Sequence, residues 1–542
     1  MTPRARRALF TVILFFAVCA LAGTLLQRRV GAQSSQDESQ LRDSLKDFAD
    51  VYTLVEQNYA EPLTQDKADD VIYDGAIPGM LQVLDPHSHF YDPKSYARLR
   101  EDQRGRYYGV GMMIEQQNNK VYVLTPYEDT PSFRAGIHPG DQIVAVDGKA
   151  TDGWTSDQVA KALKGPKGTH VQVTMARYGQ PKPLVFDLVR DEIPHPSIDL
   201  KFEIRPGVGY IHLSQFQETT GQEMEDAINS FGNLKGLLLD LRENPGGLLS
   251  QAVDVCDRLL TKGQTIVSQR GRAYADQNYV ATHGNGGKTF PIVVLVNRDT
   301  ASAAEIVSGA LQDHDRALIV GETTFGKGLV QTVYNLDEGT GLALTTYHYY
   351  TPSGRLIQRN YEGMSLYDYY NHAGALAADS SNREVKLTDS GRTVYGGGGI
   401  TPDEKIEQPT PNRFQDELTY KDVFFHFAPV YVANRTIDKN FQVDDDVMNE
   451  FKKFLTTQDV EWTDADLNGC MDWLKANIKQ GILTIQFGQL DGLRVHADWD
   501  PMIQKALNYM PEAQALEDHA NKVLAEKAQA RTETSQGVPA QP

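Results

Sequence analysis

The sequence predicts a multidomain α/β protein, on three observations. The chain has 542 residues, several times the roughly 100 to 200 residues of one domain. Hydrophobic residues make up 40% and charged residues 23%, the proportions of a globular protein rather than of a disordered or multi-span membrane chain. The spacing of apolar residues alternates along the chain between a helical and a strand period, so helical and β-rich segments follow one another.

The first 35 residues have the layout of an export signal. Three arginines within the first seven residues precede an uncharged run of 19 residues, 8–26. The small pair Gly31–Ala32 permits cleavage, whereas Arg28 and Arg29 disfavour it, and the run is just long enough to span a bilayer. Residues 1–35 are therefore either a cleaved signal peptide or a membrane anchor. In both cases the rest of the chain is expected to be exported and to face the periplasm.

Four further segments differ in pattern. Residues 36–103 have apolar side chains at helical spacing and predict an N-terminal helical domain. Residues 104–192 form short β-rich runs with one helix, which indicates a compact β domain. Residues 193–405 alternate between buried strands and helices, the pattern of a largely parallel sheet with its chemistry at the carboxyl ends of the strands. Residues 406–542 predict a helical region whose tail, from about Glu526, is disordered.

Charge and cysteine content exclude several classes of function. Acidic residues outnumber basic ones by 72 to 53, so the net charge is −19 and a nucleic-acid partner is disfavoured. The three cysteines, Cys19, Cys256 and Cys470, lie too far apart for a disulfide framework or a zinc cluster, and at most one bridge could form. Val18 before Cys19 disfavours a lipoprotein. No metal or cofactor is expected.

The first motif that carries chemistry is IVVLVNRDTASAAEI, residues 292–306. It predicts a buried strand, a polar turn and a helix that begins near Ser302. A serine at a strand-to-helix turn is exposed as a nucleophile would be, and the amide of Ala303 in the first helical turn can stabilise an oxyanion. Taken alone, the segment is explained better by a serine that only caps the helix.

The second motif is LLLDLRENPGGLL, residues 237–249. Pro245 fixes a turn, and Gly246 and Gly247 allow close backbone approach, so their amides can supply a second oxyanion donor. A tight turn without a ligand is the alternative.

The third motif is GETTFGKGLVQ, residues 321–331. It matches the glycine and lysine spacing of a phosphate-binding loop, but Gly328 stands where that loop needs Ser or Thr, and a β-hairpin pattern follows in place of a helix. Lys327 is better explained as a side chain placed into a site, and a strand period of two puts Gln331 on the same face. The alternative is a solvated loop lysine.

Together the three motifs resemble those of the C-terminal processing (tail-specific) peptidase family, in the family's order. The resemblance extends to residues 84–88, 350–355 and 396–403 and covers about residues 40–405. Glu243 stands where the family commonly has Asn, and Thr300 where it commonly has Ser.

This resemblance implies an exported serine endopeptidase with a crotonase/ClpP-like α/β core. It assigns Ser302 as the nucleophile, Lys327 as its general base and Gln331 as the residue that orients the lysine, with oxyanion donors from Gly246, Gly247 and Ala303. A lysine with an ordinary pKa of ~10.4 can act as a base only where burial lowers that value to about 7 to 8.

The β domain, residues 104–192, resembles a PDZ domain with the circularly permuted order of exported proteases, on the runs 135–141 and 145–148. The resemblance implies a carboxylate-binding loop, made by Gly109, Val110, Gly111 and Met112, for the C-terminal tails of protein substrates.

Other functions are alternatives to the Ser-Lys peptidase. A Ser-His-Asp enzyme is disfavoured because His314, the nearest histidine in sequence to Ser302, lies 12 residues away at the far end of the same helix. His87 and His89 beside Asp85 lack a third metal ligand. A non-catalytic PDZ scaffold is the alternative from another class, and the natural substrate, an adaptor and oligomerisation stay open.

Overall fold

The computed structural model describes residues 39–371, 383–433 and 435–536, which form two compact units divided between Leu84 and Asp85. The first unit is helical, with a helix over 39–58 followed by α2 (Gln65–Asp70), the π-helix η1 (Val71–Ala76) and α3 (Ile77–Gln82). None of the helices in these ranges is both long and apolar enough to cross a membrane. The predicted export segment, residues 1–35, lies outside the described residues.

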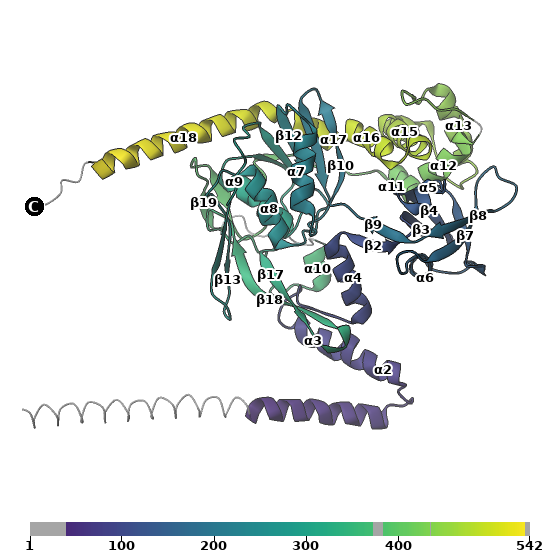
Figure 1. The fold of residues 1–542 in the computed structure, drawn as a ribbon, viewed down its shortest axis with the longest axis horizontal. Coiled ribbons are helices and arrows are strands. Elements are labelled where there is room, and N and C mark those ends of the chain that lie inside the picture. Colours follow the sequence, from purple (N-terminus) through teal and green to yellow (C-terminus); the bar gives the residue numbers. More distant parts are fainter. Residues whose placement is uncertain (1–38, 372–382, 434, 537–542) are drawn as a thin grey trace, which may run out of the picture. The chain divides into compact units, whose positions relative to one another are not determined.

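A six-stranded, mostly parallel sheet forms the centre of the second unit, in the order β10-β11-β12-β15-β16-β21 (Figure 1). Only β10 runs antiparallel to its neighbour. The strands are β10 (Ile198–Arg205), β11 (Val208–Leu213), β12 (Gly236–Asp240), β15 (Ile292–Val296), β16 (Leu318–Gly321) and β21 (Glu404–Lys405). The parallel sheet predicted for residues 193–405 is therefore confirmed.

Helices cover both faces of this sheet. Leu237 and Leu239 of β12 belong to the core beneath α7 (Thr220–Ser230), α8 (Leu249–Leu259) and α9 (Ala303–Asp313). Leu238, between them, points to the other face and packs with α17 (Pro501–Leu507) and α18 (Met510–Gln536). Burial on both faces explains why the strand sequences are continuous apolar runs rather than alternating ones.

A second sheet was not predicted as a whole. Its order is β1-β18-β13-β14, with β17 also paired to β18, and the predicted β17–β18 hairpin is confirmed. The strands are β1 (His89–Tyr91), β13 (Thr265–Arg270), β14 (Gln277–Val280), β17 (Leu329–Asn335) and β18 (Gly341–Tyr350). Strand β1 interrupts the helical pattern expected over 36–103. It was not predicted, because three residues are too few to show a strand period. Helix α4 (Pro93–Arg104) follows it.

The β domain has a separate sheet in the order β3-β4-β5-β7-β8, with β6 paired to β5. Strands β2 and β9, through which the chain enters and leaves this domain, pair with each other. Its strands are β2 (Arg106–Gly109), β3 (Met112–Gln117), β4 (Lys120–Pro126), β5 (Gln142–Val146), β6 (Lys149–Ala150), β7 (His170–Ala176), β8 (Leu184–Val189) and β9 (Asp191–Pro194). Two helices, α5 (Pro131–Arg134) and α6 (Ser156–Leu163), accompany the sheet.

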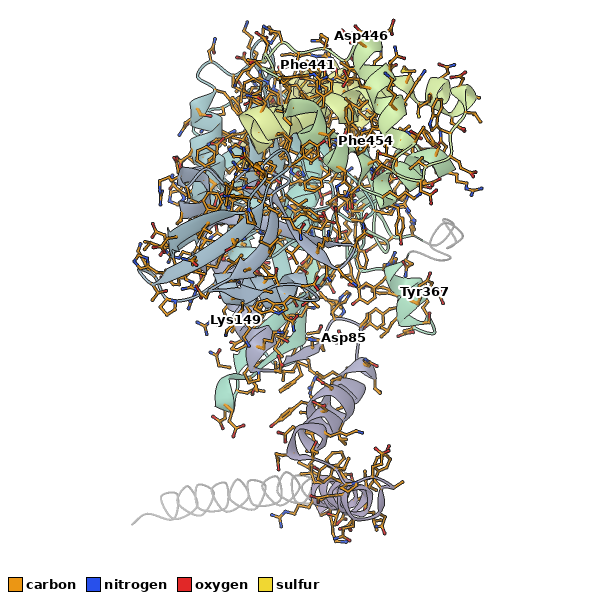
Figure 2. The ribbon with its side chains drawn as sticks, turned by 90° about the vertical axis from the view of Figure 1, so that its right-hand side faces the viewer. Asp85, Lys149, Tyr367, Phe441, Asp446 and Phe454 are labelled. Atoms are coloured by element: carbon orange, nitrogen blue, oxygen red, sulfur yellow. The ribbon has the colours of Figure 1, made fainter. Side chains whose placement is uncertain are left out.

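The C-terminal region is helical, as predicted, with a core of its own that includes Phe427, Phe451 and Leu474. Figure 2 labels Phe441 and Phe454, which pack against this core. Its helices are α11 (Arg413–Tyr420), α12 (Val423–Val432), α13 (Asp445–Leu455), α14 (Asp464–Gly469), α15 (Met471–Phe487) and α16 (Gln489–Trp499).

The structure also bears on two smaller expectations, the disordered tail and the cysteines. The predicted disordered tail is wrong for its first part: α18 continues to Gln536, because Glu, Lys, Ala, Gln and Arg in residues 526–531 are good helix formers. Cys256 and Cys470 are both buried and unpaired with each other, whereas Cys19 lies outside the described residues.

Candidate active site

Ser302 lies at the turn between β15 and α9, as the sequence predicted, and it is the N-cap of α9. Its backbone has φ 54° and ψ −114°, a conformation that a non-glycine residue adopts only when its surroundings impose it. The amide of Ser302 donates to Oε2 of Glu305 (2.8 Å), and its carbonyl accepts from the Tyr349 hydroxyl (3.0 Å). The backbone of the nucleophile candidate is therefore held on both sides.

The glycine turn that follows β12 lies directly against Ser302. A Cβ added to Gly246 would come within 2.8 Å of the Ser302 Cβ and of the Ala303 amide nitrogen, so only glycine fits. The amide of Gly246 already donates to Oδ1 of Asn244 (2.8 Å). The amide of Gly247 has no acceptor among the described residues, which favours Gly247, with Ala303, as the oxyanion donors.

Thr300 and Glu243, the two departures from the family pattern, form hydrogen bonds between the strand-to-helix turns. The Thr300 hydroxyl donates to the Leu241 carbonyl (2.8 Å), as a serine there could. Glu243 has a φ of 57° and exchanges hydrogen bonds with the Asn297 side chain at 3.1 and 2.7 Å. Asparagine adopts that backbone conformation more readily, so the Asn297 contacts offset a local cost at Glu243.

Lys327 lies in the loop that leads into β17, with its side chain largely enclosed. Burial lowers the pKa of Lys327 below its ordinary value, and the negative charges of Glu305 and Asp85 oppose that shift. The direction is the one that a lysine base requires.

Glu305, which was not predicted as a site residue, joins the two halves of the site. Its carboxylate is fully buried and accepts four hydrogen bonds. Oε2 accepts from the amides of both Ser302 (2.8 Å) and Lys327 (2.9 Å). Oε1 accepts from the Thr324 hydroxyl (2.5 Å) and the Gly326 amide (2.8 Å). A single carboxylate therefore fixes the backbone positions of both candidate catalytic residues.

The segment after the first unit also reaches the site. Asp85 accepts from the amides of His87 and Ser88, both at 2.7 Å, and from the Ser88 hydroxyl. Burial, followed by the charge of Lys327, lowers the pKa of His87 to about 3, so its imidazole is neutral. His87 shares a hydrogen bond with the Tyr369 hydroxyl (2.9 Å). Its place beside Lys327 was not foreseen, because nothing local in the sequence indicates it.

Gln331 has a different described partner from the one expected. Its amide donates to the Thr345 hydroxyl (3.2 Å), and the β17–β18 register shifts between Val330 and Gln331. Lys327 precedes the strand, so the period-of-two argument does not apply across this stretch. Orientation of the lysine by Gln331 stays a prediction.

His314, the histidine of the alternative Ser-His-Asp mechanism, has a structural role. His314 caps the far end of α9 and bonds with Asp389 (2.7 Å) and the Thr265 carbonyl (2.6 Å), about 18 Å along the helix from Ser302. The residues that the structure describes contain no group of three or more His, Cys, Asp or Glu side chains that could hold a metal ion.

The Gly109–Met112 loop has its carbonyls turned inward. The Val110 carbonyl accepts from the amide and hydroxyl of Ser132, and the Gly111 carbonyl accepts from the Tyr127 amide and Thr130 hydroxyl. In a trans peptide the N–H is antiparallel to the C=O, so the amides of Gly111 and Met112 point outward, and the Met112 amide there lies at the Tyr107 hydroxyl.

Comparison with known proteins gives three profile matches. Residues 207–364 match peptidase family S41, residues 99–176 match the PDZ domain, and residues 414–466 match the C-terminal helical domain of a probable PDZ-protease. A carboxy-terminal-processing protease of Bartonella bacilliformis is 37% identical over 74% of this chain and 84% of its own. The carboxy-terminal processing protease CtpA of Bacillus subtilis is 34% identical over 65% and 75%.

The chain belongs to peptidase family S41. The carboxyl-terminal-processing protease of Synechocystis sp., 39% identical over 52% of this chain and 68% of its own, is a further relative. The predicted family and the predicted fold class, an α/β multidomain protein with a PDZ domain, a peptidase core and a helical C-terminal region, are confirmed.

Replacing Glu305 with Gln should lower kcat about 100-fold without unfolding the protein, because an amide nitrogen cannot accept from the loop amides and the candidate catalytic residues, Ser302 and Lys327, lose their alignment. The acidic limb of the pH–rate profile should also move to lower pH, since the charge that raises the pKa of Lys327 is gone. Steady-state kinetics across pH test both. Glu223→Gln, which alters a carboxylate that accepts from the Ile198 amide, is the matched control. An unchanged kcat and pH profile in Glu305→Gln would contradict the role.

Proposed function

We propose that this S41 peptidase is a serine endopeptidase that uses Ser302 and Lys327 as a catalytic dyad. The observation that carries the proposal is that one oxygen of Glu305 accepts from the amides of both residues, which brings two segments 25 residues apart in the chain together. The lowered pKa of the enclosed Lys327 supports its role as a base.

The chemistry follows from these positions. Neutral Lys327 takes the proton of the Ser302 hydroxyl, and the serine oxygen attacks the scissile carbonyl to form a tetrahedral intermediate. The amides of Ala303 and Gly247 stabilise its oxyanion. The lysine returns the proton to the leaving amine, and water, activated in the same way, hydrolyses the acyl-enzyme. His87 stays neutral throughout and adds no competing positive charge beside Lys327.

Ser302→Ala and Lys327→Ala should each lower kcat/KM at least ~1,000-fold, and the double variant no further, because nucleophile and base act as one unit. Gln331→Ala should have an equal or smaller effect. Cleavage of an unfolded protein with an apolar C-terminus measures this, with circular dichroism as the check on folding and Lys149→Ala, at an exposed position, as the control. Activity of Lys327→Ala at neutral pH that disappears when His87 is also replaced would overturn the lysine base.

We further propose that the PDZ domain reads the free C-terminus of protein substrates. The outward amides of Gly111 and Met112 suit a carboxylate, and β3 is an edge strand with which an extended tail can pair. The Tyr107 ring lies within 2.9 Å of a Cβ built on Gly109, so the loop is bordered by an aromatic side chain.

Amidation of a substrate tail should slow its cleavage about 10-fold, because the carboxylate loses charge-assisted bonds to the loop amides. One substrate with free, amidated and acidic C-termini gives the comparison, and an unrelated protease that cuts all three alike shows that they are equally unfolded. Equal rates for the three tails would mean that the domain is not a tail reader.

Location and anchoring rest on the sequence alone. We propose an exported enzyme that acts in the periplasm, free or anchored through residues 8–26, because the arginines before the apolar run favour a cytoplasmic N-terminus.

The helix over 39–58 carries a row of exposed apolar side chains. Large apolar side chains on it and directly after it are spaced by four and three residues in turn, a heptad seam, and they are Leu41, Leu45, Phe48, Tyr52, Val55 and Tyr59. Five of the six are at least 39% exposed. A seam of this kind is complementary to a second copy of itself, so we propose that two chains pair through it.

Leu45→Glu together with Phe48→Glu should therefore halve the molar mass in solution, since two buried charges per helix disfavour the pair. Light scattering on the full chain measures the mass. Leu54→Glu is the matched control, because Leu54 is 61% exposed on the same helix but lies off the seam. An identical mass for the wild-type chain and the seam variant would refute pairing through this helix.

A further inference from the structure

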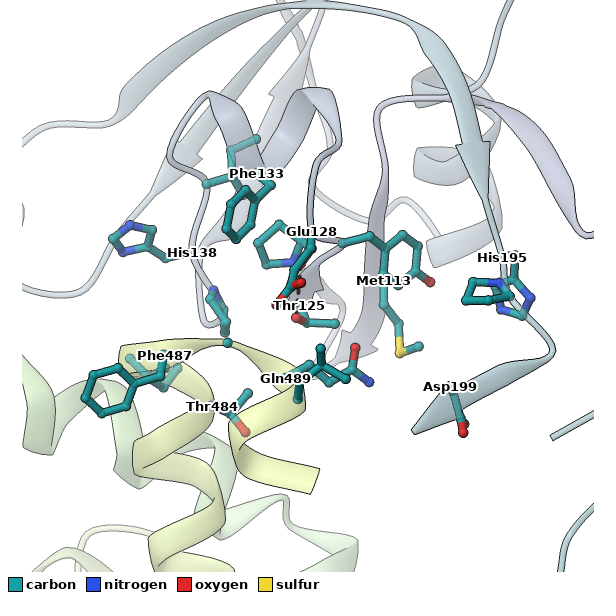
Figure 3. Close-up of a pocket in the computed structure, with 18 of the residues that line it drawn as sticks. Met113, Thr125, Glu128, Phe133, His138, His195, Asp199, Thr484, Phe487 and Gln489 are labelled. Atoms are coloured by element: carbon teal, nitrogen blue, oxygen red, sulfur yellow. Dashed lines mark hydrogen bonds between the residues drawn. The ribbon is translucent and has the colours of Figure 1, made fainter. Parts of the chain in front are cut away.

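A cavity of about 850 Å³ lies where the PDZ domain, the peptidase core and the C-terminal helices meet (Figure 3). Met113 of β3, Thr125 of β4 and Phe133 of α5 form its PDZ wall. The opposite wall is the junction of α15 and α16, residues 484–490, and Pro245 of the core is also part of the lining. Its size suits a side chain or a short stretch of polypeptide.

Apolar side chains face this space without being covered. Met113 is 37% exposed, Phe133 45% and Leu490 45%. Figure 3 shows Met113 projecting from its strand into the open centre, above Gln489. Exposed apolar side chains that are gathered around one hollow often belong to a binding site, whereas single exposed apolar side chains are common on any protein surface.

Strand geometry relates this cavity to the tail. Residues of β3 alternate in direction: Met112 and Ile114 belong to the PDZ core, whereas Met113 lines the cavity. A tail that pairs antiparallel with β3, with its carboxylate at the Gly111 and Met112 amides, sets its last residue beside Met112 and its penultimate residue beside Met113. The penultimate side chain then points to the same side as Met113 and Thr125, which are paired across β3 and β4.

We propose that the cavity is a specificity pocket for the penultimate side chain of the tail, that it takes a large apolar residue, and that the C-terminal helices supply part of it. This inference rests on the proposed reading of C-termini by the PDZ domain. A PDZ domain alone would leave that side chain in solvent, whereas here residues 484–490 cover it. Glu128 and Asp199 line the same space and disfavour an acidic side chain.

Contacts elsewhere hold the helical wall against the PDZ domain. The Gln117 amide donates to Oδ2 of Asp422 (2.9 Å). The Tyr122 ring lies edge-on to Phe425 and His426, with centroids 6.4 and 6.0 Å apart. The PDZ and helical walls of the pocket are thus in direct contact with each other beside it.

The test measures binding of labelled peptides to the full-length Ser302→Ala chain by fluorescence anisotropy. The peptides share one sequence and differ only at the penultimate position, which is Gly, Leu, Phe, Lys or Glu, and each is made as the free acid and the amide. Leu and Phe should bind about 3- to 10-fold more tightly than Gly, because part of an apolar side chain is buried, and Glu should bind most weakly.

A second variant moves the test outside the PDZ domain. Leu490→Glu should remove the preference for Leu and Phe and make Lys the best penultimate residue, by several-fold. Leu490 is in the first turn of α16, where a carboxylate is favourable, so folding should be preserved. Val185→Glu, at a 60% exposed position of β8 in the same PDZ domain, is the matched control and should leave the series unchanged.

The outcomes separate this inference from the function on which it rests. If the free acids bind better than the amides but all penultimate residues bind within about twofold, the pocket is refuted and tail reading stands. If Leu490→Glu leaves the series unchanged, the helices do not contribute and the shared pocket is refuted. Equal binding of acids and amides overturns both proposals.

Discussion

The active site depends on one buried carboxylate. Glu305 is the third residue of α9, yet its two oxygens serve backbone groups from both the serine turn and the lysine loop. A buried carboxylate is costly unless donors satisfy it, and here each donor comes from a segment without regular structure. The donors of the two loops stabilise the buried carboxylate, and the carboxylate in turn fixes the positions of the loops. A shift of either one would therefore break these hydrogen bonds. The strained backbone of Ser302 is maintained by the same bond that positions it.

The charge balance around Lys327 follows from the same arrangement. Burial lowers the pKa of Lys327, and the negative charges of two carboxylates, Glu305 and Asp85, oppose part of that shift. Each of these carboxylates is bonded to donors of its own, which weakens its pull on the lysine. The neutral His87 beside them adds no charge. The pKa of Lys327 is therefore lowered, the direction that favours the neutral, proton-accepting form of the side chain.

Sequence reasoning reached the parts of the fold and site that have local signals. The strands of the central sheet were predicted from apolar runs, and the turn residues around Ser302 and Gly246 from their composition. The short strand β1 and the extended α18 were not, since a three-residue strand has no period and helix formers at a chain end resemble a polar tail. Glu305 could have been noticed as the last residue of a serine capping box. Its bond to the Lys327 amide depends on tertiary structure, as does the approach of His87.

Pro245 connects tail recognition to the chemistry. It is part of the lining of the cavity and directly precedes Gly246, whose backbone lies against Ser302. Asn244 holds this turn from beneath, through its side-chain bonds to the Leu213 carbonyl and the Gly246 amide. A side chain that filled the cavity would pack on the exposed side of the same turn and restrict its motion. Restricting the turn would hold the Gly247 amide, the proposed oxyanion donor, in one position, and a donor fixed in advance stabilises a transition state more than a mobile one. Occupancy of the pocket can therefore favour catalysis without any change in the average structure, because the cost of ordering the turn is met before the scissile bond arrives.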